Sequence, residues 1–222
     1  VAAIRAAQLK MKVALVEREH LGGICLNWGC IPTKALLRAA ELRHSIDEMK
    51  DFGITVSGEV SIDLKAVVKR SRNVAGRLST GVAHLLKENK VTVFDDRAVL
   101  GKALSGRREV KLVGGGVLSA KHVILATGAR ARALPGIEAD GSSILTYREA
   151  MVPETMPKSL VIIGSGAIGS EFASFYLDMG VEVTLIEAMD RILPVEDAEI
   201  SDFMKKAFTK RGIKIITGAR LA

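Results

Sequence analysis

The sequence predicts an α/β fold with two Rossmann-like dinucleotide-binding domains in succession, both of them incomplete in this chain. The second domain gives the clearer pattern: a strand at residues 159–163 leads through a glycine-rich turn into a helix at 167–179 and a strand at 181–187. The first domain is indicated by a helical pattern at residues 1–10 and a strand at 12–17. A helix that feeds a strand ending in an acidic residue is the second half of a βαβ unit.

The glycine-rich turn at residues 164–169 reads GSGAIG and follows the pattern G-x-G-x-x-G. Gly164 permits the tight turn, Gly166 lets a pyrophosphate approach the backbone, and Gly169 lets the helix pack closely on the strand. The helix N-terminus supplies N–H groups and positive potential for the phosphates. Such a pattern carries little weight by itself, but its place between a strand and a helix predicts a dinucleotide site.

Glu187 ends the following strand, 18 residues after Gly169. A carboxylate at this position can accept a hydrogen bond from a ribose 2′-hydroxyl and would repel a 2′-phosphate. The sequence therefore predicts NAD in preference to NADP. Arg191 leaves the alternative open, because an arginine nearby can favour the phosphate.

The two cysteines of the chain, Cys25 and Cys30, lie within the glycine-containing segment 22–34. A disulfide needs Cα atoms about 4.4–6.8 Å apart, whereas residues five apart on a regular helix are separated by about 7.5 Å along its axis. The pair can close only if the chain turns between them, which Gly29 allows. Pro32 suits the first turn of a following helix, so Cys30 is expected at a helix N-terminus, where the dipole stabilises a thiolate.

Three interpretations of the cysteine pair compete. Buried, inert cysteines are the usual finding in a chain with two, but such residues rarely cluster among glycines. A structural zinc site is disfavoured, because His20 and His44 do not complete a ligand set at finger-like spacing. An exchangeable redox pair is the third interpretation, and the surrounding residues favour it.

Those surrounding residues carry a resemblance. Residues 22–37, GGICLNWGCIPTKALL, closely resemble the redox-active disulfide segment of the flavin-dependent disulfide oxidoreductases, and of the dihydrolipoamide dehydrogenases in particular. Glutathione and mercuric reductases share the C-x-x-x-x-C but usually differ around it. The resemblance covers essentially the whole sequence. It implies an FAD-binding domain at residues 1–150 without its first strand and glycine turn, a truncated NAD-binding domain at 151–222, and a C-terminal dimerisation domain that is absent from this chain.

The resemblance also implies roles for individual residues. By matching position, Cys25 is the thiol that exchanges with dihydrolipoamide and Cys30 is the thiolate that faces the flavin. Lys34 resembles the family lysine beside the flavin, and Glu171, in the first turn of the NAD-domain helix, resembles its ion-pair partner. The remaining FAD contacts implied are those of Glu17, at the position that binds the adenosine ribose, and of Gly23, Thr127 and Gly128.

The implied activity is the oxidation of protein-bound dihydrolipoamide with reduction of NAD, by way of the disulfide and FAD. The implied partners are a lipoyl domain of a 2-oxo acid dehydrogenase complex or of the glycine cleavage system, and a second copy of the intact parent as a homodimer. The family's His–Glu base lies outside this chain, so the fragment alone is expected to be inactive. Two alternatives stay open: a related reductase resembling glutathione reductase, mercuric reductase or soluble transhydrogenase, or a non-catalytic dinucleotide-binding protein, which would have no need of the cysteine pair.

Composition restricts the partners further. The 32 basic and 25 acidic residues give a net charge of +7, but the basic residues are scattered and aromatic residues are few, so no nucleic-acid partner is expected. No apolar run approaches the ~20 residues that span a membrane, so no membrane association is expected. In a reducing compartment two cysteines are more often catalytic than structural. The expected location is the cytoplasm.

The rest of the chain alternates between helical and extended patterns. The apolar run 122–126 predicts a strand buried on both faces of a parallel sheet, and residues 134–143 predict a turn-rich crossing between domains. Apolar residues recur at close to 3.6-residue spacing over 63–88, which predicts a long amphipathic helix. The other expected elements are helices at 34–42, 41–50 and 197–210 and strands at 91–94, 97–101, 109–113 and 213–216. Residues 114–116 are expected to form the turn of the strands at 97–101 and 109–113.

Overall fold

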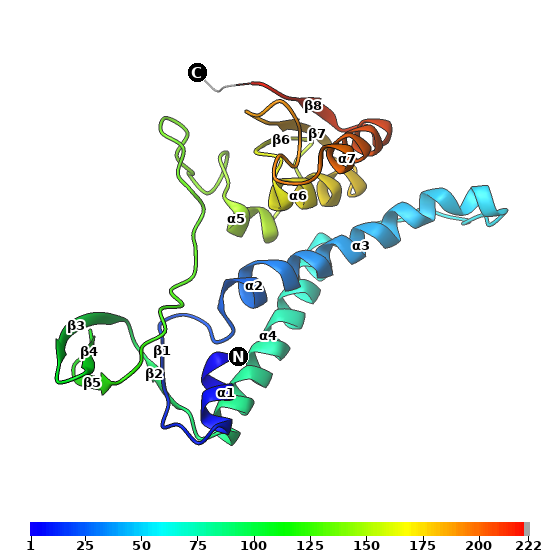
Figure 1. The fold of residues 1–222 in the computed structure, drawn as a ribbon. Helices are drawn as coiled ribbons and strands as arrows, with labels where there is room; N and C mark the ends of the chain where they lie inside the picture. The colour runs from blue at the N-terminus through cyan, green and yellow to red at the C-terminus, as the bar shows by residue number, and fades with distance from the viewer. Residues whose placement is uncertain (220–222) are drawn as a thin grey trace. The chain divides into compact units, whose positions relative to one another are not determined.

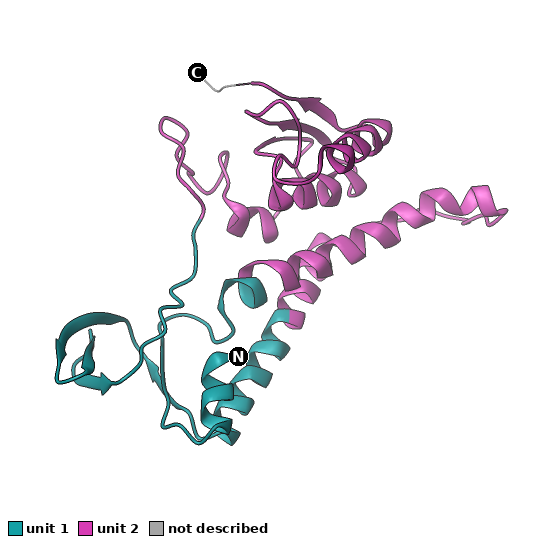
Figure 2. Ribbon diagram, viewed as in Figure 1, with its two compact units in different colours: residues 1–27, 75–130 teal, residues 28–74, 131–222 magenta. Residues whose placement is uncertain are grey.

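The computed structural model describes residues 1–219, and its helices and strands are labelled in Figure 1. The chain divides into two compact units (Figure 2). Unit 1 comprises residues 1–27 and 75–130, and unit 2 comprises residues 28–74 and 131–222. Each unit is therefore built from two separated stretches of the chain.

Unit 1 contains a parallel pair of strands and an antiparallel meander. Its elements are α1 (Ala2–Gln8), β1 (Ala14–Glu17), α2 (Gly23–Trp28, apart from its last residue), the second half of α4 (Leu64–Glu88), β2 (Thr92–Asp95), β3 (Ala98–Leu104), β4 (Arg107–Leu112) and β5 (Val117–Ala120). Strand β1 pairs in parallel with β2, from Ala14 opposite Thr92 to Glu17 opposite Asp95. The helix, strand and acidic end expected at the front of the chain are thus present.

The meander has the strand order β3-β4-β5. The glycine turn at 114–116 joins β4 to β5, so its expected place as the turn of the strands at 97–101 and 109–113 is wrong. Those strands are joined at Ser105 and Gly106, which have positive φ values. Gly115 and Gly116 have φ values of +113° and +98°, which glycine adopts most readily. Strand β5 was not predicted from the sequence. Its four residues are too few to show a clear alternation, and pairing with β4 makes them extended.

Unit 2 contains a three-stranded parallel sheet with the order β6-β7-β8. Its elements are α3 (Cys30–Glu48), the 3₁₀ turn η1 (Met49–Phe52), the first half of α4, α5 (Tyr147–Met151), β6 (Ser159–Ile163), α6 (Ala167–Asp178), β7 (Glu182–Ile186), α7 (Ala198–Arg211) and β8 (Lys214–Ile216). Strand β6 runs parallel to β7 in the register Ser159 opposite Glu182. This is the predicted βαβ arrangement, with α6 as the crossover helix.

The core of unit 2 joins α3 to α6 and extends onto the sheet. Leu36 and Ala40 on α3 are fully buried, as are Phe175 on α6 and Leu185 on β7. Tyr176 is also buried; its hydroxyl donates to the Ala150 carbonyl at 2.7 Å, and burial raises its pKa to about 12. Full burial of a side chain such as Leu36 or Phe175 contributes roughly 1.5–3 kcal/mol to the stability of the fold. The packing holds α3 against the βαβ unit formed by β6, α6 and β7.

The strand predicted at residues 122–126 is wrong: this segment has no regular secondary structure. Ile124 and Leu125 are 74% and 65% exposed, so the segment is not the doubly buried strand that its apolar residues suggested. A strand forms only where neighbouring strands accept its backbone hydrogen bonds. In the described part of the chain the parallel sheet of unit 1 consists of β1 and β2 alone.

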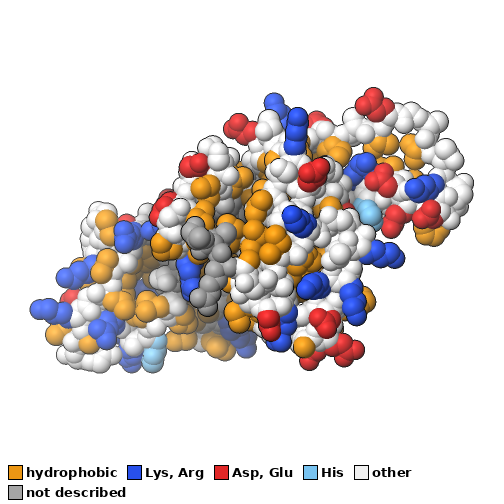
Figure 3. Space-filling view, turned by 90° about the horizontal axis from the view of Figure 1, so that it is seen from above, with side chains coloured by type: hydrophobic (Ala, Val, Ile, Leu, Met, Phe, Trp, Pro, Cys, Tyr) orange, Lys and Arg blue, Asp and Glu red, His pale blue; other side chains and the backbone are white. Residues whose placement is uncertain are grey.

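Among residues 1–219, no helix combines the length and the apolar character needed to cross a membrane. Lys and Arg side chains are interspersed with acidic and apolar ones on the face drawn in Figure 3. This agrees with the scattered basic residues of the sequence.

Candidate functional site

The redox segment, residues 22–34, consists of the short helix α2 and the first turn of α3. Gly29 separates the two helices as the N-cap of α3, and its carbonyl accepts a hydrogen bond from the Thr33 N–H at 3.1 Å. Cys30 is the first residue of α3, so its expected position at a helix N-terminus is confirmed. Cys25 and Cys30 are joined in a disulfide, and both are exposed. An exposed disulfide with one sulfur at a helix N-terminus is suited to thiol exchange.

Asn27 fixes the front of this segment. Its side chain is 5% exposed, and its Nδ2 donates to the carbonyls of Leu21 at 3.0 Å and Gly23 at 2.9 Å. The Ser79 hydroxyl donates to the same Leu21 carbonyl at 2.9 Å. Gly23 has a φ of +74°, which a residue with a side chain would adopt only under strain. Asn27 therefore fixes the backbone at the start of α2 by binding the carbonyls of Leu21 and Gly23.

Trp28, the last residue of α2, lies against two arginines. The guanidinium carbon of Arg72 is 3.9 Å from the centre of the indole ring, and that of Arg148 is 5.2 Å from it. Both distances are within the range of cation–π attraction. Trp28 also packs against the core of unit 2. Trp28, one of the four residues between the two cysteines, is thus held by side chains from α4 and α5.

Lys34 and Glu171 form an ion pair, which brings together the two residues that the resemblance implied as partners. Lys34 lies on α3 with its side chain 61% exposed, and Glu171 lies on α6 with its side chain 28% exposed. Glu171 is the fifth residue of α6, which begins at Ala167 as expected, so it lies in the second turn and its expected place in the first turn is wrong. The roles of the two residues at a flavin stay predictions.

The glycine-rich turn between β6 and α6 has the geometry of a dinucleotide cradle. Gly164 has a φ of +97° and donates its N–H to the Ile186 carbonyl at 2.8 Å. A Cβ atom on Gly169 would lie 1.9 Å from the Gly164 carbonyl oxygen, so the close approach of helix and turn requires glycine there. Gly166 is the N-cap of α6, with no atom within 4 Å of where its Cβ would be. The residues of this turn therefore fit a pyrophosphate placed at the helix N-terminus.

Glu187 follows β7 and is held at the same turn. Its Oε2 accepts hydrogen bonds from the Ser165 N–H at 2.9 Å and the Ser165 hydroxyl at 2.7 Å, and its Oε1 accepts from the Met189 N–H at 2.9 Å. Burial raises the pKa of Glu187, but these hydrogen bonds and one from the Ala188 backbone together hold it below the ordinary value. The side chain is thus a fixed carboxylate, which fits a ribose hydroxyl. The nearby Arg191 donates to the Pro194 carbonyl at 3.2 Å.

Unit 1 contains four of the residues expected at FAD: Glu17, Gly23, Thr127 and Gly128. Glu17 ends β1, and its Oε1 accepts hydrogen bonds from the N–H groups of Arg18 and Glu19, each at 2.9 Å. This fixed carboxylate fits the adenosine ribose of a dinucleotide. Thr127 and Gly128 are exposed in the irregular segment after β5, where Gly128 has a φ of +75°. Their contact with a flavin stays a prediction.

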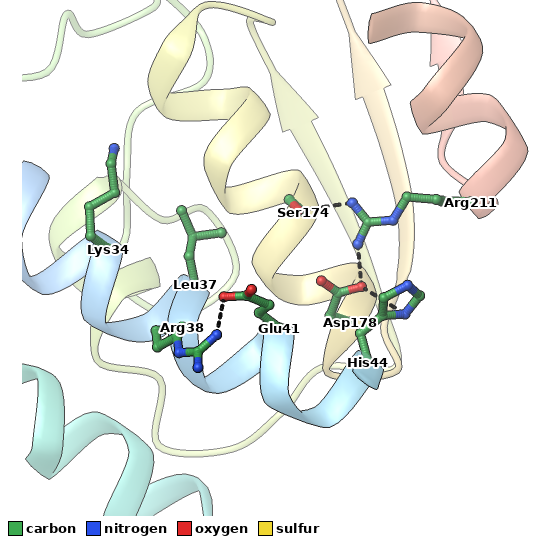
Figure 4. A pocket seen from close by; sticks show the side chains of 8 residues that line it. All are labelled: Lys34, Leu37, Arg38, Glu41, His44, Ser174, Asp178 and Arg211. Atoms are coloured by element: carbon green, nitrogen blue, oxygen red, sulfur yellow. Dashed lines mark hydrogen bonds and ion pairs between the residues drawn. The ribbon is translucent and has the colours of Figure 1, made fainter. Parts of the chain in front are cut away.

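A groove between α3 and the helices α6 and α7 has Lys34 among its lining residues (Figure 4). Asp178 is its central group: it pairs with Arg211, and its Oδ1 is 3.7 Å from His44 Nδ1. Arg211 also donates to the Ser174 hydroxyl at 3.2 Å. Charges of both signs meet in this groove, so its polar groups bind α3 to α6 and α7.

Sequence reasoning missed several residues of the site. Asn27 and Trp28 stand inside the cysteine motif, and Ser165 is a variable position of the glycine motif, so their side chains gave no separate signal. Arg72 and Arg148 are distant in sequence, and only the packing of α4 and α5 in unit 2 brings them to Trp28.

The chain matches the pyridine nucleotide-disulphide oxidoreductase family over residues 1–222. It is 54% identical to a dihydrolipoyl dehydrogenase of Rhizobium etli, covering 100% of this chain and 49% of that protein. A dihydrolipoyl dehydrogenase of Bacillus subtilis is 48% identical, with 100% and 48% covered.

Two solved structures are also similar to this chain. LpdA from Mycobacterium tuberculosis superposes with a TM-score of 0.88 at 28% identity, covering 99% of this chain and 48% of that one. The HOCl-induced flavoprotein disulfide reductase RclA from Escherichia coli has a TM-score of 0.79 at 26% identity, with 99% and 46% covered. The chain thus spans about half the length of the relatives it matches. Its disulfide, its dinucleotide turn and its match over the full length show that it belongs to the pyridine nucleotide-disulphide oxidoreductase family.

Proposed function

We propose that this chain forms the FAD- and NAD-binding part of a dihydrolipoyl dehydrogenase. The observation that carries the proposal is the exposed Cys25–Cys30 disulfide at the N-terminus of α3, in a chain that also holds a dinucleotide turn with a fixed acidic residue. The names of these two relatives support the substrate, a protein-bound dihydrolipoamide. Oxidation of this dithiol with reduction of NAD is the activity proposed for the whole protein.

The cysteines carry out the exchange step. A thiolate of the substrate attacks Cys25 Sγ, the Cys25–Cys30 bond breaks, and Cys30 leaves as a thiolate that the N-terminus of α3 stabilises. The second substrate thiol, after loss of its proton, then displaces Cys25 from the mixed disulfide. The substrate becomes a disulfide, and the chain's disulfide becomes a dithiol. FAD, when bound, supplies the two-electron chemistry that links this dithiol to NAD.

Each cofactor has assigned residues in this proposal. Gly164, Gly166 and Gly169 hold the pyrophosphate of NAD, and Glu187 accepts from its ribose. On the FAD side, Glu17 accepts from the adenosine ribose, and Lys34, paired with Glu171, lies beside the flavin. Gly23, Thr127 and Gly128 complete the FAD contacts.

The remaining assignments concern the whole protein. Residues 1–150 belong to its FAD-binding domain and 151–222 to its NAD-binding domain. The partner is a lipoyl domain of a 2-oxo acid dehydrogenase complex or of the glycine cleavage system, and the working form is a homodimer. We place it in the cytoplasm, where reducing conditions let a disulfide act as a catalyst.

Turnover with two thiol substrates tests this function. The full-length protein, purified with FAD, is supplied with NAD and either dihydrolipoamide or glutathione, and NADH formation is followed. We expect NADH with dihydrolipoamide only, and its loss in Cys25→Ser and Cys30→Ser. NADH formation with glutathione instead would show that glutathione, and not dihydrolipoamide, is the substrate. Unchanged turnover in either cysteine variant would exclude the disulfide from the reaction.

A further inference from the structure

Trp28 occupies a position that the exchange chemistry does not use directly. It stands between Cys25 and Cys30 in the sequence, ends α2, and directly precedes the Gly29 break before α3. Its ring is half-buried and packs against the core of unit 2. A shift of the Trp28 backbone would therefore move the segment that joins the two cysteines.

The two arginines that contact Trp28 are themselves held in place. Arg72 Nη1 donates to Met151 Sδ at 3.8 Å, and Met151 is 1% exposed. Arg148 belongs to α5, whose first turn is fixed by the capping box of Thr146 and Glu149. A capping box of this kind satisfies two N–H groups at the helix start and stabilises the helix there.

The Arg148 side chain is fixed as well, because its Nε donates to the Tyr147 hydroxyl at 3.4 Å. Burial lowers the pKa of Arg72, but an arginine stays charged near neutral pH. Two held cations therefore lie against the one aromatic ring of the redox segment.

We propose that Trp28, held by Arg72 and Arg148, is a positioning residue that sets the equilibrium between the disulfide and the dithiol. This inference rests on the proposed redox role of Cys25 and Cys30. In the dithiol form the covalent bond no longer holds the sulfurs together, and the fixed turn does so instead. The closer the dithiol form keeps its sulfurs, the higher their effective concentration and the more the disulfide is favoured.

A role in packing alone makes a different prediction. Loss of the ring would then lower the free energy of unfolding and leave the disulfide–dithiol equilibrium unchanged. Lysine substitution of the arginines distinguishes stacking on the Trp28 ring from an effect of the positive charge alone. Lysine keeps the charge but lacks the planar guanidinium that stacks on a ring.

The test measures the equilibrium of the full-length, FAD-loaded protein without oxygen or NAD. The protein is equilibrated with mixtures of reduced and oxidised dithiothreitol, its thiols are alkylated, and the alkylated cysteines are counted by mass spectrometry. Reduction of Cys25–Cys30 consumes one dithiothreitol dithiol and yields its cyclic disulfide, so electrons and protons balance. Dihydrolipoamide is not used, so failure of the proposed substrate does not affect the result.

Trp28→Ala is expected to shift the midpoint about tenfold toward the dithiol, which equals about 30 mV for a two-electron couple. Trp28→Phe keeps a ring and should shift it less. Arg72→Lys and Arg148→Lys should each shift it by about two- to fivefold in the same direction. Arg77→Lys, at an exposed position of the same helix α4, is the matched control and should leave the midpoint unchanged.

Two outcomes overturn the proposal. One is a wild-type midpoint in both Trp28→Ala and Trp28→Phe, whatever their stability. The other is a wild-type midpoint in both lysine variants. Should Trp28→Ala fail to fold, Trp28→Phe and the two lysine variants decide the question by themselves.

Discussion

Ser165 holds the carboxylate of Glu187 with both its backbone N–H and its hydroxyl, at 2.9 Å and 2.7 Å. Ser165 is fully buried and Glu187 is 8% exposed, so water does not replace these hydrogen bonds easily. The same Ser165 hydroxyl accepts a weaker hydrogen bond from the Leu193 N–H at 3.3 Å. One serine of the glycine turn therefore aims the acidic residue that we assign to the ribose of NAD.

The hydrogen bonds between Ser165 and Glu187 predict how substitutions at these two positions affect NAD binding. Ser165→Ala removes one of the hydrogen bonds that orient Glu187, so we expect the free energy of unfolding to fall by roughly 1.5–3 kcal/mol and NAD affinity to fall with it. Glu187→Ala should reduce the preference for NAD over NADP, because the repulsion of a 2′-phosphate is lost. Binding titrations with both nucleotides measure this. An NAD/NADP affinity ratio that Glu187→Ala leaves unchanged would exclude Glu187 from the ribose site.

The close approach at Gly169 predicts a second effect. Gly169→Ala places a Cβ 1.9 Å from the Gly164 carbonyl, so the turn must shift and NAD binding should be lost. Gly76→Ala is the matched control within α4, because a Cβ there meets no atom within 4 Å. The control should keep NAD binding and raise the free energy of unfolding by about 0.4–1 kcal/mol. Wild-type NAD affinity in Gly169→Ala would show that the turn does not need this contact.

The anchor at Asn27 predicts a loss of stability that is specific to the redox segment. Asn27→Ala leaves the carbonyls of Leu21 and Gly23 without its two hydrogen bonds, which should cost roughly 1–3 kcal/mol. Asn89→Ala is the control, since Asn89 donates to the Leu85 carbonyl at 2.8 Å in an exposed setting. Denaturant unfolding of both variants gives the comparison. Equal losses in the two variants would contradict the anchoring role.

The ion pair of Lys34 and Glu171 predicts a spectroscopic effect. If Lys34 lies beside the flavin, Lys34→Ala removes a positive charge from the cofactor and should shift the visible absorption of the bound FAD. Glu171→Gln, which keeps the lysine but removes its partner, should give a smaller shift. Stability should change little, because an exposed ion pair is worth at most about 1 kcal/mol. A spectrum identical to that of the wild type in Lys34→Ala would place Lys34 away from the flavin.

The parts of the fold that the sequence predicted depend on local signals. Strand β6, the glycine turn and α6 follow one another within a few residues, and their pattern needs no knowledge of distant segments. The start of α3 at Cys30 was predictable for the same reason, because a glycine and a proline mark it. Short-range chemistry of this kind positions the disulfide and the NAD turn.

The parts that were not predicted depend on contacts between distant residues. The segment 122–126 has the composition of a strand, but its state depends on hydrogen-bonding neighbours that its own residues do not specify. The two arginines at Trp28 come from α4 and α5, far along the chain from the cysteines. Ser165 was unassigned because its bond to Glu187 forms only when β6 and β7 pair. Long-range packing thus completes what the motifs begin.

Titration of the full-length, FAD-loaded protein with dihydrolipoamide tests whether the Cys25–Cys30 disulfide accepts electrons from this dithiol and passes them on to NAD. The titration is done without oxygen, the visible spectrum is recorded, and NAD is added last. We expect a long-wavelength charge-transfer band from the Cys30 thiolate with dihydrolipoamide but not with glutathione, followed by NADH formation. A band with glutathione in its place, or no band with either thiol, would contradict it.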